Sequence, residues 1–422
     1  MTPLLLALGP ARSLGLPAPT AGSSATLDIL VGLFILLLAA KVGEEIFRRL
    51  GQPGVIGELA GGFVVGPYAL GLVVPGETAT VLSEIGVVIL LFAVGLEIKT
   101  DELLQVGRPA AVTAVLGVIF PIAAGAGYAL VTGQPPATAA FVGLALAATS
   151  IGITSRVLTE LGVLERRFAR IIIGAAVIDD VLALILIGIV SGAAEGDLGI
   201  ATLGLIVGAV GFVVLGFAAA RRARGLRREV FTWPLFTDTP LVLAFLLMLG
   251  LAILAAYIGL AAIIGAFVAG LIVAETEAQD EIEHEIKPLA SIFTPFFFAV
   301  TGAQLDLAAL ADPKLAVAAL LLAALGIATK VLAGLIGAHG TGRWSALAVG
   351  VGMAPRGEVG IVVVTLGLGL GLLTQDLFST VLVAVVLTTV AAPIMLNVVI
   401  PRAAAEADDR LGRAPAVGPA PG

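Results

Sequence analysis

Residues 145–158 read ALAATSIGITSRVL, an apolar run that is broken near its middle by Thr149 and Ser150. Residues 349–362, VGVGMAPRGEVGIV, carry a second break of this kind far along the chain. Interrupted membrane helices at matching places in two halves of a chain indicate inverted repeats, with a binding site near the middle of the bilayer. The alternative for either run alone is a kink filled by a neighbouring helix, because membrane helices tolerate Gly and Pro.

The composition around these two runs is that of a membrane protein. Of the 422 residues, 59% are hydrophobic and 13% are charged, and the mean hydropathy is +1.12. A soluble domain has roughly half apolar residues and about a quarter charged residues. Because the sequence contains no Cys, it excludes disulfides, thiolate catalysis and Cys-ligated metals. The net charge of −7 identifies no partner, and binding to nucleic acid is not expected.

Apolar stretches account for most of the chain, and about 20 residues suffice to cross a bilayer. We count thirteen of them, at 25–47, 53–72, 78–97, 109–132, 136–158, 167–192, 198–220, 239–257, 259–274, 288–305, 315–338, 344–372 and 376–400. The sequence therefore predicts an all-α polytopic membrane protein with about 13 transmembrane helices. Six spans, one linker and six more bring the two halves in from opposite sides, which predicts two inverted repeats with crossing discontinuous helices.

Basic residues give the expected orientation. When the loops are assigned alternately to the two sides, nearly all of the 23 Lys and Arg residues collect on one side, whereas Arg12 and Lys314 fall on the other. Cytoplasmic loops hold the excess of Lys and Arg, so the N-terminus is expected outside and the C-terminus in the cytoplasm. Residues 1–24 are expected to form a tail, with a cleaved signal as the alternative, and residues 401–422 a disordered tail.

Two adjacent acids, Asp179 and Asp180, lie at the centre of the apolar run GAAVIDDVLALIL, residues 174–186. An acid at the middle of a membrane helix costs about 2.5 to 3.5 kcal/mol, so such residues usually serve function. Neighbouring side chains on a helix point about 100° apart, so the two carboxylates cannot aim at one point. We predict that one faces an ion cavity and the other faces a different helix. A pair that serves only helix packing is the alternative.

Three further charges fall inside apolar segments. Lys330, in LGIATKVLAGLIGA, is a possible counter-charge for one of the acids, since a buried pair stays ionised only while it is paired. Arg356 and Glu358 are two residues apart, so they would not face each other on a regular helix. Half-helix ends carry about half an elementary charge, which Arg356 and Glu358 are predicted to neutralise. That role is structural and need not include contact with an ion.

Four motifs in this order resemble a known family, the bacterial monovalent cation/proton antiporter superfamily, and within it the NapA-like sodium/proton antiporters. The resemblance extends over about residues 25–400, and the motifs are ATSIGITSRVL, IDDVLAL, ATKVLAG and GMAPRGEVG. It implies that cation and proton compete for Asp180 and that Asp179 pairs with Lys330. Asp180 would thus be the Na⁺ ligand, with Asp179, Thr149 and Ser150 completing the cation and proton site. Arg356 and Glu358 fall at the second break, as in the family.

The resemblance also implies a domain plan for the transmembrane module at residues 25–400. Helices near 109–192 and 315–400 would form a core transport domain, and helices near 25–97 and 239–305 a dimerisation domain. A helix at 198–220 would link the two domains, and the resemblance implies a homodimer in the cell membrane. Related Kef-type proteins that move potassium carry a cytosolic nucleotide-binding domain, and its absence here weakens the potassium alternative.

The expected function is exchange of Na⁺ or Li⁺ for H⁺ by alternating access, electrogenic, with a role in pH homeostasis. This is a secondary transporter and not an enzyme, and no cofactor is expected. Hard cations prefer oxygen ligands, which carboxylates, hydroxyls and unwound backbone supply. The alternative is a K⁺/H⁺ antiporter. A sodium-coupled organic-anion symporter would need a roomier polar cavity, and an ion channel a continuous polar pore, so both are less favoured.

Overall fold

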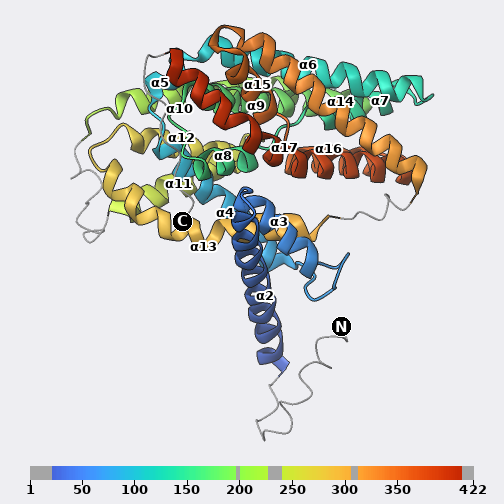
Figure 1. The fold of residues 1–422 in the computed structure, drawn as a ribbon, viewed down its shortest axis with the longest axis horizontal. Helices are drawn as coiled ribbons and strands as arrows, with labels where there is room; N and C mark the ends of the chain where they lie inside the picture. The colour runs from blue at the N-terminus through green and yellow to red at the C-terminus, as the bar shows by residue number, and fades with distance from the viewer. Residues whose placement is uncertain (1–20, 196–199, 227–239, 306–311, 411–422) are drawn as a thin grey trace, which may run out of the picture. The chain divides into compact units, whose positions relative to one another are not determined.

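The computed structural model describes residues 21–195, 200–226, 240–305 and 312–410 (Figure 1). All regular secondary structure in those ranges is helical, which confirms the predicted all-α fold. The helices are α2 (Ala21–Arg49), α3 (Gly54–Val65), α4 (Glu77–Leu96), α5 (Thr100–Gln105), α6 (Gly107–Val131), α7 (Pro136–Ala147), α8 (Ile151–Glu160), α9 (Arg167–Glu195), α10 (Ile200–Arg222), α11 (Pro240–Tyr257), α12 (Ala262–Ala274), α13 (Gln279–Ala303), α14 (Pro313–Gly337), the 3-10 helix η4 (His339–Thr341), α15 (Arg343–Gly352), α16 (Glu358–Gly369) and α17 (Gln375–Arg410).

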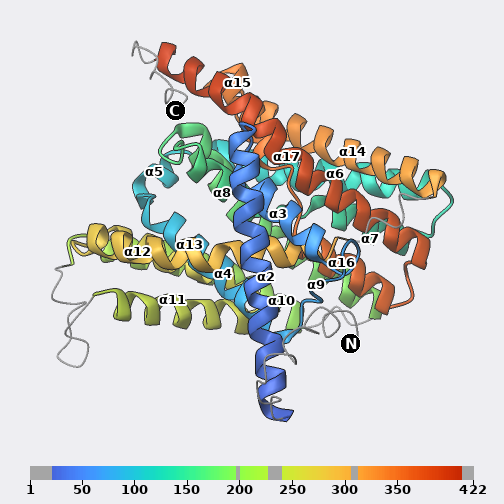
Figure 2. The same cartoon turned by 60° about the horizontal axis from the view of Figure 1, so that its bottom comes forward.

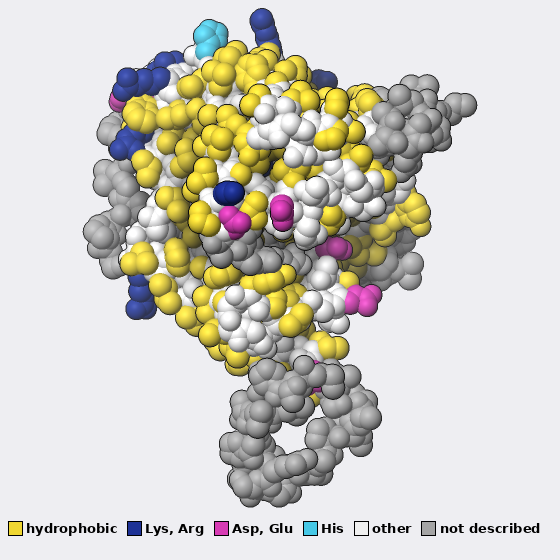
Figure 3. Space-filling view, turned by 90° about the vertical axis from the view of Figure 1, so that its right-hand side faces the viewer, with side chains coloured by type: hydrophobic (Ala, Val, Ile, Leu, Met, Phe, Trp, Pro, Cys, Tyr) yellow, Lys and Arg dark blue, Asp and Glu magenta, His cyan; other side chains and the backbone are white. Residues whose placement is uncertain are grey.

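Many of these helices can cross a membrane. Within the described ranges, eight segments are long and apolar enough to do so by length and composition, and three shorter helices are also apolar. The chain is therefore a multi-pass membrane protein, and each of the predicted apolar stretches contains a helix or a pair of helices. Figure 3 shows one face on which hydrophobic side chains predominate and charged side chains are few, as expected of a surface in contact with lipid.

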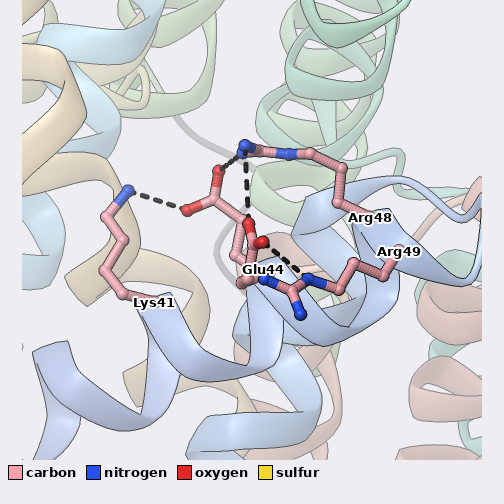
Figure 4. A network of polar contacts seen from close by, with 5 residues as sticks. Lys41, Glu44, Arg48 and Arg49 are labelled. Carbon is pink, nitrogen blue, oxygen red and sulfur yellow. Dashed lines mark hydrogen bonds and ion pairs between the residues drawn. The ribbon is translucent and has the colours of Figure 1, made fainter. Parts of the chain in front are cut away.

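Contacts divide the chain into two units, and the first comprises residues 1–87 and 290–306. Within it α2 and α3 approach closely, since a Cβ atom on Gly57 would lie 2.1 Å from the carbonyl oxygen of Gly43. The last turns of α2 are charged (Figure 4). There Lys41 Nζ lies 2.8 Å from Glu44, which also pairs with Arg48. This cluster ends the apolar part of α2.

The second unit comprises residues 88–289 and 307–422 and contains both interrupted runs. Here α14 packs on α6, α15 and α17, and the ribbons of α14 and α6 lie side by side in both views (Figures 1 and 2). The half-helices α7 and α16 share an apolar core with α17, in which Phe141, Leu144, Val363 and Val381 are buried. The grouping into a transport domain and a dimerisation domain stays a prediction.

Two predicted tail boundaries are wrong. Helix α2 already begins at Ala21, and α17 continues through Pro401 to Arg410, although residues 401–422 were expected to be disordered. The extension is helical because it has tertiary partners. Glu406 accepts hydrogen bonds from backbone N–H groups at the start of α15, and Asp408 forms an ion pair with Arg166. Residues 1–20 and 411–422 lie outside the described residues.

Candidate ion-binding site

The first interruption separates α7 from α8. Helix α7 ends at Ala147 and α8 begins at Ile151, so residues 148–150 form the break. Ala148 (φ −55°, ψ 138°) and Ser150 (φ −96°, ψ 105°) are extended rather than helical. Thr149 and Ser150 are both buried. The break therefore brings two hydroxyls and unwound backbone into the interior of the second unit.

The second interruption separates α15 from α16. Helix α15 ends at Gly352 and α16 begins at Glu358. Pro355 lies between them, and proline lacks the backbone N–H that a continuing helix needs and disfavours a helical residue before it. Residues 353–357 are likewise buried. Local sequence chemistry is thus enough to explain why the helix stops here.

The two interruptions contact each other. The backbone N–H of Ser150 donates to the carbonyl oxygen of Pro355 at 2.8 Å. The hydroxyl of Thr149 donates to the carbonyl oxygen of Met353 at 3.2 Å, and that of Thr154 to the carbonyl oxygen of Gly352 at 2.7 Å. Buried backbone polar groups need hydrogen-bond partners. Each break therefore supplies hydrogen-bond partners for backbone groups of the other break that lost their partners when the helix was interrupted.

Arg356 binds the end of the opposite half-helix. It is fully buried, and its Nε donates to the carbonyl oxygen of Leu146 at 2.9 Å, one residue before α7 ends. Nη1 donates to the carbonyl oxygen of Ala354 at 2.9 Å. The C-terminal end of a helix carries a partial negative charge, which a guanidinium offsets. The predicted place for Arg356, at the end of a crossing half-helix, is where the structure has it.

Gly326 on α14 forms one wall around this guanidinium, and the sequence reasoning missed it. A Cβ atom at Gly326 would lie 2.7 Å from Nη2, 2.9 Å from Cζ and 3.0 Å from Nη1 of Arg356. No residue larger than glycine fits unless Arg356 moves. The available signal was spacing, because Gly326 and Lys330 are four residues apart and therefore share one face of α14.

Lys330 and Asp179 form a buried ion pair. Nζ of Lys330 lies 2.9 Å from Oδ1 of Asp179, and both side chains are fully buried. Gly117 on α6 covers the pair, since a Cβ atom there would lie 3.4 Å from Nζ. Two opposite charges held at this distance neutralise each other, whereas either charge alone would be costly at this depth.

Asp180 follows Asp179 on α9 and is also buried, with 3% of its surface exposed. Its side chain leaves the helix about 100° away from that of Asp179. In the part of the chain that the structure describes, Oγ of Ser150 and Oδ2 of Asp179 are buried without a hydrogen-bond partner. Carboxylate and hydroxyl oxygens are the ligands that hard cations such as Na⁺ prefer.

Glu358 is the remaining predicted site residue. Its backbone begins α16 directly after the break, but its side chain lies outside the described part of the structure. Six predicted residues, Thr149, Ser150, Asp179, Asp180, Lys330 and Arg356, are buried in one unit of the fold. Thr389 on α17 was missed, and its hydroxyl donates to the backbone oxygen of Arg356.

Known proteins share both sequence and fold with this chain. Residues 32–400 match the family described as "Sodium/hydrogen exchanger, transmembrane". The chain is 35% identical to the High-affinity Na(+)/H(+) antiporter NhaS3 of Synechocystis sp., over 94% of this chain and 96% of that protein. It is 33% identical to the Na(+)/H(+)-K(+) antiporter GerN of Bacillus cereus, over 86% of this chain and 94% of that protein.

The fold has a counterpart among solved structures. The sodium proton antiporter MjNhaP1 from Methanocaldococcus jannaschii superposes with a TM-score of 0.65, covering 89% of this chain and 98% of that chain. At 18% identity the likeness concerns the fold. The chain therefore shares its overall fold with this solved structure.

Proposed function

The chain belongs to the sodium/hydrogen exchanger family, and on that premise we propose that it is a Na⁺/H⁺ antiporter in which the two ions compete for Asp180. Four curated relatives named as Na⁺/H⁺ antiporters, at 31–35% identity, support the exchange reaction, although one of them is also named for K⁺. Membership also agrees with the resemblance to monovalent cation/proton antiporters. As a transporter, the protein moves its substrates without converting them.

One observation carries the assignment to Asp180. A second buried carboxylate stands directly beside an ion pair, Asp179 with Lys330 at 2.9 Å. Its helix packs on both breaks, since Ala183 shares an apolar core with Ala148 and Val359. A buried carboxylate is stable when a proton or a cation neutralises it. Because either Na⁺ or a proton can neutralise Asp180, binding of one displaces the other. The same carboxylate can therefore carry Na⁺ across the membrane in one direction and a proton in the other. The hydroxyls of Thr149 and Ser150 would complete the oxygen shell of Na⁺.

Arg356 and Glu358 would hold the breaks rather than bind the ion. Arg356 donates to the end of α7, which supports a role in half-helix charge compensation. Alternating access would then follow from movement of a transport domain, at 109–192 and 315–400, against a dimerisation domain in a homodimer. The proposed location is the cytoplasmic membrane, with the N-terminus outside and the C-terminus inside. No cofactor is needed for this cycle.

Exchange would be electrogenic because the site has two acids. If Asp179 and Lys330 also release and take up a proton, the empty carrier returns two protons for each Na⁺, and net charge crosses the membrane. Each charge moved across 100 mV is worth about 2.3 kcal/mol, so a membrane potential alone would drive the cycle. A K⁺/valinomycin potential imposed on proteoliposomes at equal pH tests this. Na⁺ flux that ignores its sign and size would show one-for-one exchange.

Cation selectivity is the test of the exchange itself. Proteoliposomes with an acidic interior and a pH-sensitive dye are given Na⁺, Li⁺ or K⁺ in turn. We expect Na⁺ and Li⁺ to raise the internal pH. A response to K⁺ alone would favour the K⁺/H⁺ alternative. The Bacillus cereus relative is named for K⁺ as well as Na⁺. Uptake of Na⁺ without proton efflux would contradict antiport.

A further inference from the structure

An apolar groove lies between α10 and α11, away from the ion site. Both helices pack on α12, which forms its floor. The groove has a volume of about 460 Å³ and is lined only by apolar residues and glycine, among them Gly211, Leu215 and Ala219 of α10, Leu254 of α11, Ile258 directly after α11, and Val268 of α12. Sites of this size hold small molecules or parts of them.

The groove is elongated. It follows α10 from Val207 to Ala219, a length of about 18 Å at 1.5 Å per residue. An extended alkyl chain is apolar along its whole length, so it fits along a groove of this lining and length.

Positive charge lies at one end of the groove. Residues 208, 211, 215 and 219 of α10 line it, and the same helical spacing places Arg222 on this face one turn further on. Arg221 and Arg222 are exposed, and neither forms an ion pair with another described residue. Two acids near this end, Glu275 and Asp101, share one ion-pair partner, Arg224, at 3.1 and 3.0 Å. With Arg221 and Arg222 the three arginines outnumber these two acids. The end of the groove thus favours an anion.

We propose that this groove binds an acyl chain of an anionic phospholipid, whose phosphate lies at Arg221 and Arg222. The apolar lining, the elongated shape and the basic end match the tail and the headgroup in the order in which a bilayer presents them. Basic residues near a membrane surface attract anionic lipids, and each raises the binding affinity by a factor of several. A lipid in this position would fill the space between α10 and α11 and hold both helices on α12.

The experiment measures lipid binding directly on the detergent-purified full chain by native mass spectrometry and thermal shift. Phosphatidylglycerol and phosphatidylcholine with identical acyl chains are compared. We expect the unchanged protein to bind and be stabilised more by phosphatidylglycerol. Arg221→Gln with Arg222→Gln should weaken phosphatidylglycerol binding about tenfold and leave phosphatidylcholine unaffected. Arg410→Gln, at an exposed arginine elsewhere, is the matched control and should bind as the unchanged protein does.

A second variant tests the tail site. Gly211→Leu fills the groove without a clash, since a Cβ atom there has no neighbour within 4 Å, and it should weaken binding of both lipids. Gly250→Leu on α11, which is equally open and lies outside the groove, is its control. Equal binding of the two lipids by the unchanged protein would overturn the proposal. So would equal stabilisation by inorganic phosphate, or a change of oligomeric state in Gly211→Leu, which would assign the groove to a second copy.

Discussion

The two interruptions resemble each other in the backbone and differ in chemistry. The first break, between α7 and α8, presents hydroxyls and no charge of its own. The second, between α15 and α16, contributes Arg356, whose guanidinium binds the end of α7. Carbonyl oxygens of the second break also accept the hydrogen bonds of Thr149 and Thr154. One break thus carries candidate ion ligands, and the other holds it in place.

The long helices after the breaks repeat this contrast. Helix α9 places two acids, Asp179 and Asp180, in the interior, whereas α17 places two buried threonines, Thr388 and Thr389. Thr389 donates to the backbone of Arg356, and Thr388 to the carbonyl oxygen of Val385. The two halves therefore share a backbone plan but differ in their side chains. The first half holds the acids, and the second half supplies the groups that neutralise and fix them.

The largest expected effect comes from removing the charge in the first half. Asp180→Asn keeps the shape of the side chain but removes both the charge and the titrating proton, so exchange in proteoliposomes should be lost while the protein still folds. Asp376→Asn, at an exposed aspartate in the first turn of α17, is the control and should exchange normally. Exchange that persists in Asp180→Asn with its pH dependence intact would place the ion site elsewhere.

Breaking the ion pair that joins the halves should have the next largest effect. Lys330→Ala leaves Asp179 as an uncompensated buried charge and should lower the free energy of unfolding by about 3 to 5 kcal/mol. Adding Asp179→Asn should recover much of that loss. Lys314→Ala, at an exposed lysine on the same helix, should change stability little. Thermal unfolding of the unchanged protein, the two single variants, the double variant and the Lys314→Ala control checks this. Additive losses in the cycle would show that Lys330 and Asp179 are not coupled.

A smaller effect is expected where α14 touches Arg356. Gly326→Ala introduces a Cβ atom 2.7 Å from Nη2, which should push the guanidinium away from the end of α7 and cost about 1 to 3 kcal/mol. Gly250→Ala, in an open position on α11, should instead be neutral or stabilising by about 0.5 to 1 kcal/mol, because alanine favours a helix. If both substitutions behave alike in thermal unfolding, the second break does not depend on the contact between Gly326 and Arg356.

The smallest effect concerns a group outside both breaks. Burial, reinforced by the charge of Glu283, raises the pKa of Glu97 above its ordinary value of 4.5. The folded protein therefore holds this proton more tightly than the unfolded chain does. The resulting stability is fully present below pH 4.5 and is lost as the pH rises through the pKa of the folded state.

Glu97→Gln should remove this loss of stability at higher pH, because glutamine does not titrate. Its melting temperature should fall less between pH 4 and pH 7 than that of the unchanged protein, as measured by thermal shift across this range. Glu77→Gln, at an exposed glutamate that begins α4, is the control. A curve for Glu97→Gln that parallels the unchanged protein would assign the pH dependence of stability to other groups, including the buried acids of α9.

Local chemistry made much of the fold predictable. Pro355 and the polar residues at 149–150 predict the two breaks, because they interrupt otherwise apolar helical segments. The predicted stretches at 239–257 and 259–274 meet at Gly259, which has a φ of 90° between the end of α11 and the start of α12. The need of a buried acid for a counter-charge pointed to Lys330, which lies beside Asp179. Each of these signals is contained within a few residues.

Contacts between distant segments could not be predicted in the same way. The spacing of Gly326 and Lys330 places both on one face of α14, but it does not reveal that Gly326 borders Arg356. Nothing near Leu146 reveals that its carbonyl oxygen accepts from a guanidinium 210 residues away. The helix at 401–410 was missed because its composition resembles a disordered tail. Its order comes from Glu406 and Asp408, whose partners lie on other helices.

The contact of Glu406 sets a limit for protein engineering. Its carboxylate accepts hydrogen bonds from the backbone N–H groups of Arg343, Trp344 and Ser345, at the start of the half-helix that leads to the second break. A reporter or affinity tag joined after residue 400 would delete that acceptor, although all apolar stretches would remain. Joined after residue 410, the same tag would leave it in place. Fusions made to follow expression or folding should therefore begin beyond Arg410.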